Sequence, residues 1–91
     1  MKVEFDENKS QRNAKEWRLP FTMAADFDFS TARAVEDLRS RYPERRFVAL
    51  GYIGRRLHVL CFTPIVDGIR VTSLRKANTR EVKIYGKEKS D

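Results

Sequence analysis

The sequence predicts an α+β fold with two N-terminal helices, an antiparallel meander of three strands, or about four if residues 31–40 add one, and a short C-terminal helix. Two helix-start signals, Asp6 and Thr22, lie in the first third of the chain. The middle holds apolar segments rich in β-branched and aromatic residues, with short turns between them. The last segment opens with a pair of capping residues typical of a helix start. A chain of 91 residues suffices for one domain, and we expect residues 1–91 to form it.

The N-terminal segment predicts a short strand followed by a polar helix. Residues 2–5 alternate between polar and apolar side chains, as a strand does. Asp6 is a good N-cap for a helix over residues 7–17. Ala14 and Trp17 are the apolar residues that we expect to attach this helix to the core.

A second helix is expected after the break at Pro20. Thr22 is suited to cap it, and the helix would run from Met23 to about Phe29. The residues suited to pack against a sheet are Ala24, Ala25 and Phe27.

Residues 31–40 fit either a helix or a strand. Ala34, Val35 and Leu38 have helical spacing, but the same segment also alternates tolerably as a strand. Periodicity alone leaves both structures open for so short a segment.

The segment from residue 43 to residue 75 predicts three consecutive antiparallel strands. Glycine and proline mark the turns, and the segments between them are apolar and rich in β-formers. The expected order is a turn at Pro43, a strand over 47–50 ended by Gly51, a hairpin turn at 54–56, a strand over 57–63, a turn over 64–68 and a strand over 69–75.

The last helix is predicted from a capping box. Asn78 is the N-cap, and Glu81 three residues later completes the reciprocal pair. We expect Val82 and Tyr85 to form its buried stripe and Gly86 to end it.

Charge points to a polyanionic partner. The net charge is +6, and residues 1–30 carry five Lys or Arg against six Asp or Glu, so the positive field belongs to residues 31–91. Such a field favours RNA, DNA or an acidic protein. The alternative to a polyanionic partner is that the positive charge only keeps the domain soluble.

Composition argues against a metal, a disulfide and a membrane anchor. One histidine and one cysteine cannot build an ordinary zinc site, and we expect Cys61 to be a small buried hydrophobe. The acidic pairs near Asp6 and Asp26 fit helix ends better than Mg²⁺ ligands. We therefore expect no metal and no cofactor. No apolar stretch approaches the ~20 residues of a membrane helix, and no secretory signal is visible, so we expect a cytoplasmic protein.

Three blocks in the same order carry a family resemblance. They are residues 5–9 with Asn13, Phe21 and Ala24-Ala25; residues 44–51; and residues 69–77 with Arg80-Glu81, with Phe62-Thr63 between the last two. The sequence resembles the BrnT family of toxins from bacterial type II toxin–antitoxin systems, which are similar in fold to RelE ribonucleases. Glu16-Trp17-Arg18 departs from the Lys-His-Gly common in that family. The resemblance favours a strand for residues 31–40.

The resemblance also implies a function. A BrnT-like protein would be a ribonuclease that arrests translation and is neutralised by a co-encoded BrnA-type antitoxin. That partner is typically a ribbon-helix-helix protein, so operator DNA would be bound only through it. Two other hypotheses fit the basic charge: a non-catalytic RNA- or DNA-binding module, and an adaptor for an acidic protein.

Four residues are candidates for metal-independent RNA cleavage, which needs proton transfer, stabilisation of the phosphorane charge and in-line positioning. Arg75, at a strand end, is the first choice for holding the phosphate, and Arg46 is the second. His58 titrates near neutrality and Glu44 lies at a turn, so both are acid–base candidates. Each has a structural alternative: a salt bridge for the charged residues and a hydrogen-bonded strand position for His58.

Further cations are candidates for RNA binding. We expect the cations of residues 69–80 to converge on one phosphate pocket. Glu81 is expected to be a cap rather than a catalyst, and Trp17 either stacks on a base or anchors its helix. The RNA-binding candidates are Lys9, Arg70, Lys76 and Arg80.

Overall fold

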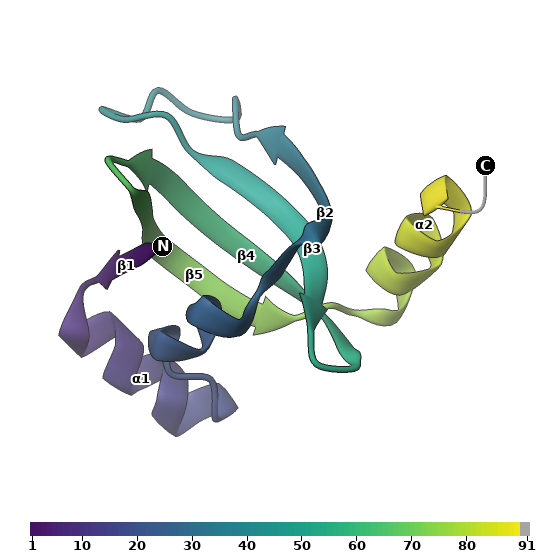
Figure 1. Cartoon of the computed structure of the whole chain (residues 1–91), viewed down its shortest axis with the longest axis horizontal. Helices are drawn as coiled ribbons and strands as arrows, with labels where there is room; N and C mark the ends of the chain where they lie inside the picture. The colour runs from purple at the N-terminus through teal and green to yellow at the C-terminus, as the bar shows by residue number, and fades with distance from the viewer. Residues whose placement is uncertain (90–91) are drawn as a thin grey trace.

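Five strands form one sheet in the order β1-β5-β4-β3-β2 in the computed structural model, which describes residues 1–89 (Figure 1). The class is α+β, as predicted. The elements are β1 (Lys2–Phe5), α1 (Glu7–Trp17), the 3₁₀ helix η1 (Phe21–Asp26), β2 (Asp28–Glu36), β3 (Phe47–Ile53), β4 (Arg56–Ile65), β5 (Gly68–Lys76) and α2 (Thr79–Lys89).

The sheet is mixed, so the prediction of a purely antiparallel meander of four strands is wrong. Strands β2 to β5 pair antiparallel, but β1 adds to β5 in parallel, with Lys2 opposite Gly68 and Phe5 opposite Val71. Gly68 permits this pairing, because a Cβ there would lie 1.9 Å from the Lys2 carbonyl oxygen. A pairing across more than sixty residues leaves no local signal in the sequence.

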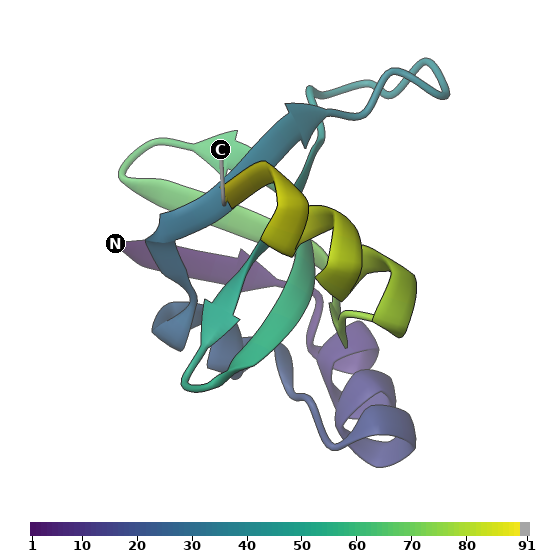
Figure 2. The same ribbon diagram turned by 90° about the vertical axis from the view of Figure 1, so that its right-hand side faces the viewer.

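The sheet has a hydrophobic cluster on each face. One face packs against η1 and contains Leu60 and Leu74, both fully buried. The other face packs against α2 and contains Leu57, Val59 and Tyr85. Figure 2 shows α2 lying across the sheet, with α1 and η1 at one end of the molecule. Because side chains alternate along β4, each one lies either on the face under η1 or on the face under α2.

Helix α1 begins where predicted, because the Asp6 carboxylate accepts a hydrogen bond from the Lys9 amide at 3.1 Å. The expected anchoring role of Trp17 is wrong, since its side chain is 62% exposed. Polar contacts attach the helix instead. Ser10 Oγ accepts from the Phe21 amide at 2.8 Å, and Asn13 Nδ2 donates to the Leu74 carbonyl at 2.8 Å.

The second helix is the 3₁₀ turn η1 rather than an α-helix over residues 23–29, and no side chain caps it. Ala24 and Phe27 are buried as expected, whereas Ala25 is exposed. The chain extends from Asp28 into β2, and this places the Phe27 ring against Gly51 of β3.

Three strand boundaries also differ. Residues 31–36 are a strand, as the resemblance favours, but 37–40 are not. Gly51 lies inside β3 rather than at its end. β4 continues through Ile65, so its turn to β5 is only Val66-Asp67.

Helix α2 has the predicted capping box. Asn78 N donates to Glu81 Oε1 at 2.9 Å, and Glu81 N donates to Asn78 Oδ1 at 2.8 Å. Tyr85 is buried, but Val82 is 45% exposed, and the helix passes through Gly86 to Lys89. The expected roles of Val82 and Gly86 are therefore wrong. No helix within residues 1–89 is long and apolar enough to cross a membrane.

Candidate active site

A cavity of about 490 Å³ opens on the α2 face of the sheet. It lies between the loop that joins β2 to β3 and the first turn of α2, over the middle of β4 and β5, and α1 closes one side. Its lining is Lys9, Asp37, Arg39, Arg46, Phe47, Val48, Val59, Cys61, Thr72, Ser73, Arg75 and Glu81. Its four cations come from three segments of the chain: Lys9 from α1, Arg39 and Arg46 from the β2–β3 loop, and Arg75 from β5.

Arg75 is fixed in the cavity by Glu81. Its two terminal nitrogens donate to the two Glu81 carboxylate oxygens, each at 2.8 Å. The hydrogen bonds of this pair raise the pKa of Arg75 and lower the pKa of Glu81. Glu81 is thus both the helix cap that was predicted and the residue that orients Arg75.

Arg46, unlike Arg75, contacts an aromatic ring rather than a carboxylate. Its Cζ lies 4.2 Å from the centre of the Tyr42 ring, a cation–π contact. Among residues 1–89, Arg46 forms no ion pair. A bound anion would therefore gain a cation that no internal carboxylate neutralises.

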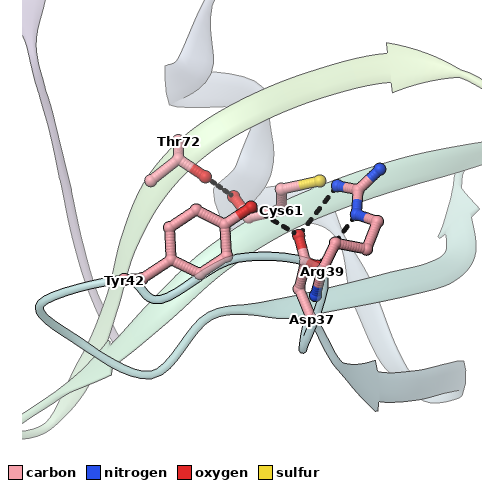
Figure 3. A network of polar contacts seen from close by, with 5 residues as sticks. All are labelled: Asp37, Arg39, Tyr42, Cys61 and Thr72. Carbon is pink, nitrogen blue, oxygen red and sulfur yellow. Dashed lines mark hydrogen bonds and ion pairs between the residues drawn. The ribbon is translucent and has the colours of Figure 1, made fainter.

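The β2–β3 loop is held over the cavity by a polar network (Figure 3). Asp37 accepts hydrogen bonds from Arg39 at 2.9 and 2.8 Å and from the Tyr42 hydroxyl at 3.2 Å. The bonds from Arg39 hold the pKa of Asp37 well below its usual range. The Asp37 amide also donates to the Arg46 carbonyl at 2.7 Å, which closes the loop at its base.

Beneath this loop lies Cys61, which Figure 3 shows beside the Asp37–Arg39 pair. Its side chain is partly buried and packs against the hydrophobic cluster of the α2 face, so the expectation of a small buried hydrophobe is met only in part. Partial burial still raises the pKa of the thiol.

The structure separates the residues expected to act on RNA. Arg75, Arg46 and Lys9 line the cavity. Glu44 instead binds Arg70 at 2.8 and 3.0 Å, and this pair lies outside the cavity lining. Lys76 and Arg80 do not line the cavity either. Of the cations between residues 69 and 80, only Arg75 therefore points into it, and the expected convergence is wrong.

His58 lies on the opposite face of the sheet from Arg75. Alternation along β4 puts it with Leu60, while Val59 lies under the cavity. It is 3% exposed, its Nδ1 is 2.8 Å from the Arg56 carbonyl oxygen, and burial lowers its pKa. The geometry supports the structural role for His58.

Sequence reasoning missed Asp37, Arg39 and Tyr42. These residues lie in a loop, and no periodicity or motif relates them to Arg75, which is more than thirty residues away. Alternation within β4 puts residues 58 and 59 on opposite sides of the sheet, but only the pairing of Val59 with Arg75 shows which side the cavity occupies.

The fold and the cavity define a class: a small mixed-sheet protein that presents an arginine-rich cavity between a loop and the C-terminal helix. Guanidinium groups are suited to phosphate oxygens because their planar donors match them in pairs. Within residues 1–89, no three His, Cys, Asp or Glu side chains gather closely enough to hold a metal ion.

Comparison with known families gives the finer assignment. A family model described as the ribonuclease toxin BrnT of type II toxin–antitoxin systems matches residues 5–81. The chain therefore belongs to the BrnT family of ribonuclease toxins, as its sequence suggested. The match spans every residue that lines the cavity, from Lys9 to Glu81. No curated protein and no solved structure matches the chain.

Proposed function

We propose that this protein is a metal-independent endoribonuclease that cuts RNA in the arginine-lined cavity and thereby inhibits translation. Membership of a ribonuclease toxin family supports RNA cleavage. The observation that carries the choice of site is the placement of Arg46 and Arg75 around one cavity, with Arg46 free of any internal carboxylate in residues 1–89.

The phosphodiester would lie between these two guanidinium groups. The ribose 2′-hydroxyl attacks the phosphorus and loses its proton to water, which leaves additional negative charge on the phosphate oxygens. Cations that are already oriented stabilise this charge without reorganisation. Glu81 supplies that orientation for Arg75, and the Tyr42 ring supplies it for Arg46. Removal of one such donor typically costs about 10²–10³ in kcat.

Proton transfer has fewer candidates in the cavity than expected. Asp37 and Glu81 are both paired with arginines that lower their pKa, so both are weak bases. Lys9 lines the cavity and carries an ammonium group, and we assign it to protonate the leaving 5′-oxygen. Charge stabilisation and in-line positioning then supply most of the rate.

The wider system is part of the same proposal. The family is one of type II toxin–antitoxin systems, so an antitoxin partner is implied. We propose a BrnA-type, ribbon-helix-helix antitoxin that neutralises the toxin in the cytoplasm and contacts operator DNA on behalf of the complex. Lys76 and Arg80, outside the cavity, are candidates to contact RNA further along the strand.

The test is cleavage of a defined RNA by the purified protein in excess EDTA. We expect cleavage in EDTA, and a loss of about 10²–10³ in kcat for Arg46→Ala and for Arg75→Ala. Arg55→Ala is the matched control, because it removes the same charge from an exposed hairpin turn. The proposed ribonuclease activity would be refuted if RNA stays intact with and without chelator while the protein has a normal circular dichroism spectrum. Equal losses for all three variants would refute the site.

One observation favours a second candidate, a non-catalytic RNA-binding module. Both carboxylates in the cavity are already paired, so no obvious base is free. Binding that weakens steeply with salt and yields no product would support this alternative.

A further inference from the structure

A second depression adjoins the cavity and contains the only tryptophan of the chain. It has a volume of about 440 Å³ and is lined by Asn13, Trp17, Leu19, Ser73, Leu74, Arg75 and Lys76. Ser73 and Arg75 also line the cavity, so the two hollows meet at β5. Trp17 is 62% exposed, which is unusual for so large an apolar side chain.

Helix α1 runs alongside both hollows. Lys9 lines the cavity, and Asn13 and Trp17 line the depression. These three residues are spaced four apart along the helix. Residues four apart share a helix face, so these three form one stripe, about 12 Å long at 1.5 Å per residue. The amide of Asn13 donates to the Leu74 carbonyl at 2.8 Å and fixes the stripe against β5.

Beyond Val71, the outer edge of β5 has no strand partner within residues 1–89, because β1 pairs only with Gly68 to Val71. Figure 1 shows α1 near this end of β5, below the sheet. A single strand of nucleic acid that reached from the arginine cavity to Trp17 would run past Ser73 and Arg75, which line both hollows.

We infer that Trp17 is a stacking platform for one nucleobase of the RNA, a nucleotide or two from the phosphate held in the cavity. This inference rests on the proposed nuclease function. A flat aromatic surface beside the cations Arg75 and Lys76 matches a nucleotide, which joins a flat base to an anionic phosphate. Continuity with the cavity through Ser73 and Arg75 favours a base of the same RNA over a separate protein ligand. Stacking on exposed aromatic side chains is a common way to bind single strands.

The first test uses the fluorescence of Trp17, which reports this depression alone because the chain has no other tryptophan. The probe is a short RNA with 2′-O-methyl groups, which cannot be cleaved. We expect it to quench the fluorescence, and an abasic nucleotide at one position of the probe to abolish the quenching. Absence of quenching, or equal quenching by every abasic probe, would overturn the inference. Quenching by the purified antitoxin but by no RNA would also overturn it, because the depression would then belong to the partner.

The second test is cleavage kinetics. We expect Trp17→Ala to raise KM by about 5- to 150-fold with kcat changed less than about twofold, because base stacking contributes to binding. Trp17→Phe should restore part of the affinity. Val66→Ala is the control, since it trims another exposed apolar residue, 85% exposed, at the β4–β5 turn. An unchanged KM for Trp17→Ala would refute the platform.

The two tests separate this inference from the proposed function. Base-dependent quenching without any cleavage would retain the platform and refute the nuclease. Cleavage that is indifferent to Trp17 would retain the nuclease and refute the platform.

Discussion

Substitution of Glu81 separates two roles that one side chain performs. Its carboxylate accepts the Asn78 amide as part of the capping box, and it also binds both terminal nitrogens of Arg75. Glu81→Gln keeps an acceptor for the Asn78 amide but removes the charge. Glu81→Ala removes both interactions.

The expected costs follow from these contacts. Arg75 is 46% exposed in its side chain, so the ion pair is screened and contributes only about 0.2–1 kcal/mol. The cap contributes about 1 kcal/mol more. For a domain of this size about 1 kcal/mol lowers Tm by roughly 4–8 °C. We therefore expect Glu81→Gln to unfold a few degrees below the wild type and Glu81→Ala roughly 5–15 °C below it.

The assay is thermal unfolding followed by circular dichroism from pH 7 to pH 2. Arg75 lowers the pKa of Glu81 from its ordinary 4.5, so the pair stabilises the fold above that pH. The contribution disappears as pH falls through the lower pKa of the folded state. The Tm difference between wild type and Glu81→Gln should therefore shrink as the solution is acidified. A constant difference, or equal Tm values for the Gln and Ala variants, would refute this division of roles.

Three further predictions concern the packing at Gly51, the hydrogen bond of Tyr85 and the reactivity of Cys61. Gly51→Ala should cost about 1–3 kcal/mol in thermal unfolding, because the new Cβ would lie 2.5 Å from the Phe27 ring, and an unchanged Tm would mean that the ring moves freely. Tyr85→Phe should cost about 1 kcal/mol in urea unfolding, because its hydroxyl donates to the Thr31 carbonyl; no loss would count against that bond. Cys61 should react with iodoacetamide more slowly than a free thiol at pH 7.5, because partial burial raises the pKa of its thiol; a normal rate at pH 7.5 would contradict this.

Features specified by neighbouring residues were predicted well. The Asp6 cap and the Asn78–Glu81 capping box involve residues at most three apart, and both form as expected. The hairpin turn at residues 54–56 and the strands on both sides of it also appear, with longer bounds. Such features depend on backbone conformations that a few residues determine locally.

Features that depend on packing were predicted poorly. Whether Trp17 is buried depends on what lies opposite α1, and polar contacts from Ser10 and Asn13 already hold that helix. The parallel partner of β1 is set by the backbone of Gly68, far along the chain. Neither the exposure of Trp17 nor the pairing of β1 with β5 can be recognised from periodicity in the sequence.

The sequence alone determined the fold class, the helix caps, the basic charge of residues 31–91 and, through the order of its three blocks, the family. Only the tertiary structure decided which cations share a cavity. In the folded protein, Arg75, Arg46 and Lys9 line the same cavity. Glu44 is hydrogen-bonded to Arg70, and His58 is buried on the other face of the sheet. The physical reason is that charge and propensity belong to single residues and their neighbours, whereas a site depends on distances that the chain fixes only when distant segments pack together.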